Sequence, residues 1–341
     1  MSSSMPAKRA SGSLFGLALG DALGADTEFL SYDAILRRFP VDGTQMPSSN
    51  PIRVTDDTQM TLAVGNALLE AARPYTADTL EEPLKHAFVA WNTSPDNNRA
   101  PGVTCMNACN KLATGQPWQQ CSVIGSKGCG ANMRVAPVGL LPLGKDGVTA
   151  ETRAAIAQFQ AALTHGHPTG LAAADLTTAA IADLIADGDL QGLPQRLRAY
   201  ALSQRTIYHA EWLGSLWQHS SHSSPQDYIA HGWDECLRVL DRLDRALALM
   251  DRTNDPCQIT GAGWIAEEAL ATGLLCFLLF PDDPVAAIKR AATSSGDSDS
   301  IACLTGAFAG AYAGLKAWPE EWVARIEYRA QLLRLGAGWD N

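Results

Sequence analysis

An all-α fold is predicted by three features of this sequence of 341 residues. Long segments place apolar residues at the 3.6-residue spacing of amphipathic helices. Alanine, leucine and glycine dominate, while β-branched runs are scarce. Alternation of the kind found in strands does not persist over more than a few residues. Since 46% of the residues are hydrophobic, the chain can bury a large core, and we expect one compact domain of many helices.

The expected helices follow one another along the chain. In the first, Phe15, Leu19 and Leu23 share an apolar face, and Gly24 is expected to end the helix. The later segments with helical spacing are 60–71, 172–186, 235–250, 301–315 and 322–333. Loops rich in glycine, proline and polar residues lie between them, at 40–51, 92–102 and 125–130.

Charge and composition exclude several classes of protein. The charged fraction of 18% is low for a disordered chain, and the net charge of −10 argues against binding along a nucleic-acid backbone. An anionic small ligand stays compatible, because metal ions and helix N-termini supply positive potential. The apolar run 14–23 is interrupted by Gly16, Gly20 and Asp21, so we expect neither a signal peptide nor a membrane partner.

The eight cysteines are interpreted as buried, reduced thiols. None belongs to a CxxC pair, and several lie in apolar segments, as Cys276 does. Free thiols of this kind are typical of the reducing cytoplasm, where we expect the protein to be located.

Two acidic clusters are the clearest signs of chemistry. Asp56 and Asp57 stand at the start of one predicted helix, and Asp297 and Asp299 stand at the start of another. Ordinary helix capping explains either cluster alone. Together they supply four carboxylates that would repel one another unless cations neutralised them, and Mg²⁺ prefers oxygen ligands of this type.

Further segments carry weaker signals. Glu28 follows the first helix, where a surface glutamate is the ordinary interpretation. The glycine-rich segment 125–134 exposes backbone N–H groups that can bind a diphosphate, although a plain turn explains it equally well. His165 and His167 are compatible with a metal site, a general base or a turn, and without a third soft ligand nearby we discount zinc. Residues 205–233 hold four histidines and match no motif.

Six short segments, which follow one another along the chain in a particular order, can be considered together. They are GDALGADTEF (20–29), TDDTQMTLA (55–63), SKGCGANMRVAPVGLL (126–141), THGHPTG (164–170), GWIAEEAL (263–270) and SGDSDS (295–300). Together they resemble the ADP-ribosylglycohydrolase family, which includes the dinitrogenase-reductase-activating glycohydrolases, from Gly12 to about Trp322. The resemblance implies an orthogonal all-α bundle, a single domain over 1–341 with a binuclear metal cleft, and a flexible segment at 1–11.

The resemblance also implies roles for particular residues. It implies that two Mg²⁺ or Mn²⁺ ions are held by Thr55, Asp56, Asp57, Asp297, Asp299 and Ser300. It points to Glu28 beside the scissile bond and, with Asp56, as a catalytic carboxylate. It implies that ADP-ribose contacts Asp96, Ser126, Gly128, Gly130, Ala131, Asn132, Met133, His165 and Trp264.

The sequence departs from the family pattern at three places. Ser300 stands where many members have threonine, which keeps the hydroxyl group, and Ser295 stands where glycine is usual. Residues 95–99 replace the usual Asp-Ile-Gly-x-Thr-Thr run, and Asp96 is expected to take its acidic role.

The activity that the resemblance implies is metal-dependent hydrolysis of an N- or O-glycosidic bond. The substrate would be an ADP-ribosylated protein side chain or a small ADP-ribosyl acceptor, with ADP-ribose as the product, and the acceptor group is left open. Two alternatives stay open as well: a module that binds ADP-ribose with little catalysis, and a hydrolase of another glycoside or phosphoester on the same scaffold. A purely structural helical scaffold leaves the paired acids unexplained.

Overall fold

The computed structural model describes residues 7–39, 47, 49–186 and 189–340. Within these ranges the chain forms eighteen α-helices and no sheet, with only three isolated β-bridges, so the all-α prediction is confirmed. The helices are α1 (Arg9–Gly24), α2 (Tyr32–Arg38), α3 (Asp56–Glu70), α4 (Ala77–Asn92), α5 (Val103–Leu112), α6 (Trp118–Cys121), α7 (Ala136–Gly139), α8 (Ala150–Ala162), α9 (Pro168–Ile185), α10 (Leu193–Gln204), α11 (Ala210–Leu213), α12 (Pro225–Leu249), α13 (Cys257–Thr260), α14 (Ala266–Leu279), α15 (Pro284–Ala292), α16 (Ser298–Ala313), α17 (Glu320–Arg325) and α18 (Arg329–Trp339). Four 3-10 helices lie between them, namely η1 (Cys129–Ala131), η2 (Lys145–Gly147), η3 (Leu216–His219) and η4 (Leu315–Ala317).

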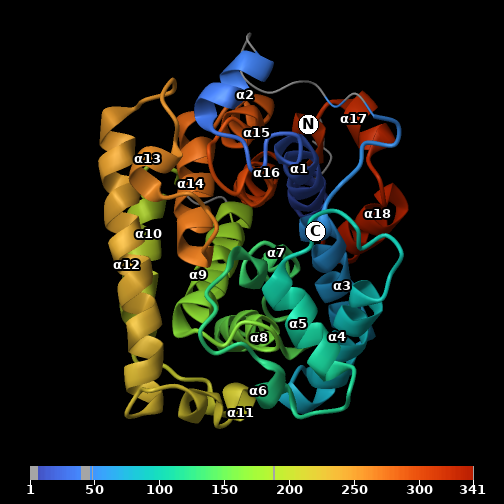
Figure 1. Ribbon diagram of the computed structural model, residues 1–341, viewed down its shortest axis with the longest axis vertical. Coiled ribbons are helices and arrows are strands. Elements are labelled where there is room, and N and C mark those ends of the chain that lie inside the picture. Colours follow the sequence, from blue (N-terminus) through green and yellow to red (C-terminus); the bar gives the residue numbers. More distant parts are fainter. Residues whose placement is uncertain (1–6, 40–46, 48, 187–188, 341) are drawn as a thin grey trace, which may run out of the picture.

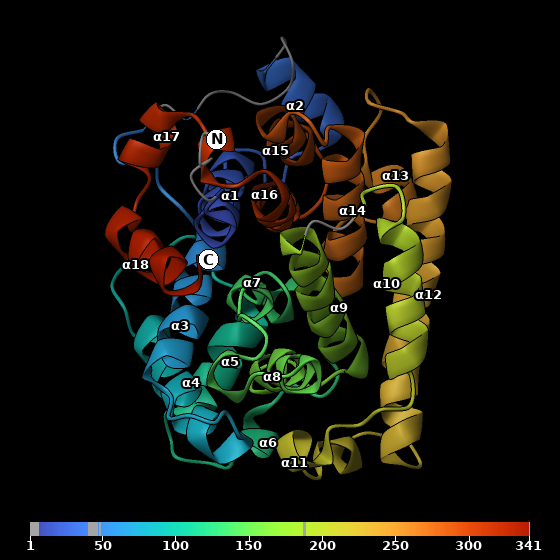
Figure 2. The same cartoon turned by 180° about the vertical axis from the view of Figure 1, so that it is seen from behind.

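The helices cross one another rather than running in one direction. In Figure 1, α9 and α12 lie in the plane of view while α8 is seen nearly end-on beneath α7. The long helix α12 forms one edge of the molecule, and α3, α4 and α18 form the opposite edge, as the reverse view in Figure 2 also shows. One continuous apolar core, with residues from nearly every helix, fills the space between these edges. The expected orthogonal bundle is therefore the observed arrangement.

Helices α1 and α16 pack against each other more closely than side chains normally allow. A Cβ atom on Gly20 would lie only 1.9 Å from the carbonyl oxygen of Ala302. One turn later along α1, a Cβ atom on Gly24 would lie 2.3 Å from the Cα atom of Asp299, one turn earlier along α16. The two helices are thus antiparallel, and the end of α1 lies beside the start of α16. The α1 glycines in this contact recur every four residues, on one face of the helix: Gly12, Gly16, Gly20 and Gly24.

Two expectations about the ends of the chain need correction. The segment expected to be flexible reached residue 11, but α1 already begins at Arg9, and Ser11 is buried where it donates hydrogen bonds to the carboxylate of Asp340. Residues 1–6 of that segment lie outside the described residues. The single helix expected over 322–333 is divided into α17 and α18, because the backbone at 326–327 instead pairs with Ile52.

Two other sequence-based expectations concern membranes and thiols. Among the described residues, no helix is long and apolar enough to cross a membrane. All eight cysteines are buried and none forms a disulfide, which confirms the interpretation of them as buried thiols.

Candidate active site

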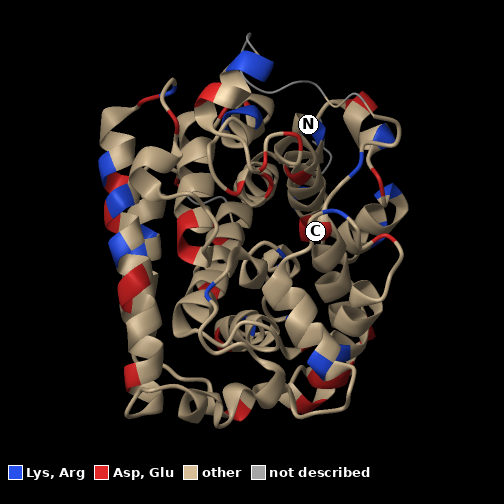
Figure 3. Ribbon diagram, viewed as in Figure 1, with Lys and Arg blue, Asp and Glu red and all other residues tan. Residues whose placement is uncertain are grey.

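A cleft of about 330 Å³ opens where the loop after α1, the start of α3 and the start of α16 meet. Figure 3 marks acidic residues on these segments. The remaining walls come from residues 100–105, which lead into α5, and from the glycine-rich segment that contains Gly128 and Gly130. The close packing of α1 on α16 is what brings the first and last of these acidic segments together.

Carboxylates converge in this cleft. One oxygen from each of Glu28, Asp297 and Asp299 lies within 4.8 Å of the other two, an arrangement that can hold a metal ion. Asp56 and Asp57, in the first turn of α3, line the same cleft. Both α3 and α16 direct their N-termini here, and the partial positive charge of a helix N-terminus favours acidic groups.

Hydrogen bonds hold the start of α3 in place. Thr55 caps the helix, since its hydroxyl accepts from the backbone N–H of Asp57 at 3.4 Å. The same hydroxyl donates to Asp21 at 2.7 Å and lies 3.4 Å from a carboxylate oxygen of Asp299. The carboxylate of Asp56 accepts from the backbone N–H of Gly102 at 3.2 Å. These hydrogen bonds hold Thr55 and the Asp56 carboxylate in place at the start of α3.

Asp21 is a residue of this site that the sequence analysis did not select. It is fully buried on α1 and accepts hydrogen bonds from the backbone N–H and hydroxyl groups of both Thr55 and Thr58. It thus joins α1 to the start of α3 directly beneath the acid cluster. The sequence does carry a signal that could have identified Asp21, namely an acidic residue inside an otherwise apolar helical segment.

Burial and mutual repulsion shift the titration of this cluster upward. Burial, with the charge of Asp299 as the next cause, raises the pKa of Glu28 to about 9, of Asp56 to about 8 and of Asp21 to about 7. The same causes, in the same order, raise the pKa of Asp57 and of Asp297 well above the usual range of a carboxyl group. A cation bound here would favour the ionised forms, so its binding would be coupled to proton release.

The glycine-rich segment is anchored to the start of α14. Gly128 forms a β-bridge with Ile265, and the N–H of Cys129 donates to the carbonyl of Trp264 at 3.1 Å. Gly130 has no room for a side chain, since a Cβ atom there would lie 2.6 Å from the sulfur of Cys105. Gly128 is the more open position and faces the cleft.

His165 forms part of the cleft floor as a neutral imidazole. It is 1% exposed, and its Nδ1 lies 2.7 Å from the hydroxyl of Thr164. Burial, followed by the nearby charge of Arg134, lowers the pKa of His165 well below its usual value. Arg134 itself is fully buried, where its guanidinium donates to the Gln160 side chain at 2.8 Å and lies over the ring of Phe88.

Two aromatic side chains stand at the mouth of the cleft. The rings of Phe29 and Trp264 stack with their centroids 5.5 Å apart and their planes 22° from parallel. Phe29 is 68% exposed and Trp264 is 43% exposed, which is unusual for residues of this size. Together they offer a flat apolar surface beside Glu28.

A family model described as ADP-ribosylglycohydrolase matches residues 2–339 of the chain. The chain belongs to the ADP-ribosylglycohydrolase family. Membership of this family supports hydrolysis of ADP-ribosyl linkages as its activity.

Relatives of this chain occur in several other organisms. The ADP-ribosylhydrolase ARH3 of Danio rerio is 27% identical over 347 residues, which cover 95% of this chain and 87% of its own. The ADP-ribosyl-(dinitrogen reductase) glycohydrolase of Rhodospirillum rubrum is 33% identical over 168 residues, which cover 47% of this chain and 52% of its own. A solved ADP-ribosylglycohydrolase-related protein complex shares the fold, with a TM-score of 0.69 and 21% identity over 96% of this chain and 95% of that chain.

Most of the site residues expected from the sequence line one cleft. They are Glu28, Asp56, Asp57, Gly128, Gly130, Met133, His165, Trp264, Asp297, Asp299 and Ser300. Thr55 lies directly behind them, within 3.4 Å of Asp299. Ser126 lies beside the cleft, with its hydroxyl 3.0 Å from that of Thr104.

Besides Ser126, three residues that were expected to contact the ligand do not line the cleft. Asp96 is exposed and accepts from the hydroxyl of Tyr328 at 3.2 Å, because the loop at 94–98 folds toward α18. Ala131 and Asn132 are fully buried behind the glycine-rich segment, where the Asn132 amide donates to the carbonyl of Ala266 at 3.1 Å. The sequence does not show which side chains of an irregular loop point into the cleft and which point away from it.

The sequence analysis also missed parts of the cleft wall. Phe29 and residues 100–105 line the cleft, and none of them was selected. Only a weak signal was available for them: Phe29 ends the segment GDALGADTEF, and residues 100–105 follow a polar loop.

Proposed function

We propose that this protein is a metal-dependent hydrolase that releases ADP-ribose from ADP-ribosylated protein side chains or small ADP-ribosyl acceptors. The observation that carries the proposal is the convergence of Glu28, Asp297 and Asp299, whose carboxylate oxygens lie within 4.8 Å of one another in the cleft. Family membership supplies the class of reaction, and the acid cluster supplies the groups for it.

We assign two ions, Mg²⁺ or Mn²⁺, to the oxygen atoms of Thr55, Asp56, Asp57, Asp297, Asp299 and Ser300. Hard cations prefer such ligands. One carboxylate oxygen of Asp57 is buried and has no hydrogen-bond partner among the described residues, which suits an atom reserved for a cation. When bound, the ions supply positive charge that orients the sugar and stabilises charge developing at the scissile bond.

Glu28 is our candidate for proton transfer. It is the one member of the converging trio that lies on a loop rather than at a helix N-terminus. With no ion bound, burial and then the charge of Asp299 raise the pKa of Glu28 to about 9. A carboxyl group beside the scissile bond can pass a proton to the leaving group. Asp56 is the second candidate, with its carboxylate oriented by the N–H of Gly102.

The rest of the cleft suits the ADP-ribosyl part of the substrate. Gly128 lines the cleft, where a diphosphate can approach its backbone, and the neutral His165 beside it offers a hydrogen bond without a fixed charge. The stacked Phe29 and Trp264 offer a platform for a flat group at the mouth of the cleft.

A panel of peptides ADP-ribosylated on Arg, Ser or Asp/Glu tests this proposal. Release of ADP-ribose in Mg²⁺ or Mn²⁺, abolished by EDTA, is the expected result, and the pattern across the panel identifies the acceptor. Binding of ADP-ribose without turnover would instead favour a binding module. Turnover confined to an unrelated glycoside or phosphoester would favour the other alternative.

A further inference from the structure

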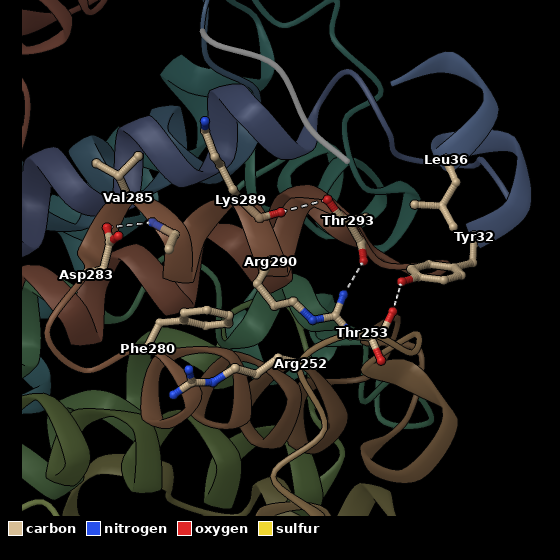
Figure 4. Close-up of a pocket in the computed structure, with 11 residues that line it drawn as sticks. Tyr32, Leu36, Arg252, Thr253, Phe280, Asp283, Val285, Lys289, Arg290 and Thr293 are labelled. Atoms are coloured by element: carbon tan, nitrogen blue, oxygen red, sulfur yellow. Dashed lines mark hydrogen bonds between the residues drawn. The ribbon is translucent and has the colours of Figure 1, made fainter. Parts of the chain in front are cut away.

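A second pocket lies against α15. It has a volume of about 530 Å³, within the range of small-molecule sites. Its walls come from α2, from the turn after α12 and from α15, and Figure 4 shows the side chains that line it. None of its lining residues lines the catalytic cleft.

The pocket gathers positive charge on a protein that is acidic overall. Arg252, Lys289 and Arg290 line it, and Asp283 supplies the one carboxylate among the described lining residues, while the whole chain carries a net charge of −10. The Asp283 carboxylate is engaged in capping α15, since it accepts from the N–H of Ala286 at 3.0 Å. Among the described residues, neither Arg252 nor Arg290 forms an ion pair with a carboxylate.

Arg290 is the unusual member of this group. It is only 7% exposed, and one guanidinium nitrogen, Nη1, donates to the carbonyl of Thr293 at 3.1 Å. Its Nε and Nη2 are buried and have no partner among the described residues. These two N–H groups form the edge of a guanidinium that binds phosphate or carboxylate through two parallel hydrogen bonds. Leaving such donors unpaired is costly, so an anion that accepts from them is strongly favoured.

The other walls are apolar and held in place. Tyr32, Leu36 and Phe280 line the pocket, and the Tyr32 hydroxyl donates to the carbonyl of Thr253, which ties α2 to the turn after α12. Figure 4 shows Arg290 extending between Phe280 and Thr253. Arg252, in turn, lies over the ring of Phe280 at 4.8 Å. A ligand here therefore meets cationic groups and an apolar surface together.

We propose that this pocket binds a small anionic ligand, a phosphate or carboxylate carried on an aromatic or other apolar group. The N–H groups at Nε and Nη2 of Arg290 donate hydrogen bonds to the oxyanion, and the exposed Arg252 adds a second positive charge. The site is separate from the cleft that binds ADP-ribose under the proposed function, and it stands or falls independently of that function.

Calorimetric titration of the full chain in EDTA tests the proposal, because metal removal keeps the catalytic centre from recruiting the anion. The probes are phenyl phosphate, benzoate and inorganic phosphate. Phenyl phosphate or benzoate is expected to bind, more tightly than inorganic phosphate, and the preferred one identifies the anionic group. Arg252→Gln and Arg290→Lys are each expected to weaken this binding by about tenfold, since each removes a charged hydrogen bond.

Two controls make the result specific. Arg329→Gln removes an exposed cation on α18, outside the pocket, and Asp57→Asn alters the catalytic cleft; both are expected to leave binding unchanged. Arg252 is exposed, so its variant keeps the test valid even if Arg290→Lys fails to fold. Equal binding by wild type and Arg252→Gln, an equal loss in Arg329→Gln, or a loss only in Asp57→Asn overturns the proposal.

Discussion

The raised pKa values of the acid cluster can be tested by measuring how the stability of the metal-free protein changes between about pH 7 and about pH 8. Burial and the charge of Asp299 raise the pKa of Asp56 to about 8 and that of Asp21 to about 7. An unfolded chain ionises its aspartates near pH 4, at about their ordinary pKa. Between these values the native state holds more protons than the unfolded state, so the free energy of unfolding falls as the pH rises.

The size of the effect follows from proton counting. One extra proton on the native cluster lowers the free energy of unfolding by about 1.4 kcal/mol per pH unit. Unfolding entropy of about 2.1 cal/mol/K per residue converts this, for 341 residues, into a melting temperature about 2 °C lower. The neutral buried His165 changes stability in the opposite direction, but mainly below the ordinary histidine pKa near 6.5.

Differential scanning fluorimetry in EDTA and in Mg²⁺ at several pH values measures this slope. Mg²⁺ binding keeps the carboxylates ionised in the native state, so it is expected to raise the melting temperature and flatten the slope. Asp56→Asn is expected to flatten the slope in EDTA, whereas the matched variant Asp26→Asn, at an exposed position two residues before Glu28, leaves it unchanged. A flat profile for the wild type in EDTA, or a slope that Mg²⁺ does not alter, would refute the reasoning.

Three further predictions concern turnover and packing. Glu28→Gln is expected to keep ADP-ribose binding and to lower turnover by about 10²–10⁴-fold, measured beside its metal affinity; a parallel loss of metal would make Glu28 a ligand. Gly306→Ala places a Cβ atom 1.9 Å from the carbonyl oxygen of Gly16 and is expected to destabilise the fold by about 1–3 kcal/mol in urea unfolding; wild-type stability would contradict the close helix contact. Gly130→Ala meets the sulfur of Cys105 at 2.6 Å and is expected to lower stability as well as ADP-ribose affinity, so a fully stable variant with weakened binding would show that the glycine serves the ligand alone.

The sequence by itself determined the helical class and most of the acid cluster. Helical periodicity reports which face of each segment is buried, and that is a local property of the chain. The segments that include Asp57 and Asp297 were recognisable because an acid-rich helix start and an ordered set of motifs are local patterns as well. Sequence context alone also predicted that the eight cysteines are buried free thiols.

Only the tertiary structure decided which of these residues meet. The distance from Glu28 to Asp299 depends on the close contact of α1 with α16, in which Gly20 lies against Ala302. Asp21 lies in the site and Asp96 lies outside the cleft for the same reason. In each case, hydrogen-bond partners far away in the sequence determine where the polar side chain points. The pocket around Arg290 has no sequence signature, because it arises where three separate segments meet around a buried guanidinium edge that has no partner in the described part of the chain.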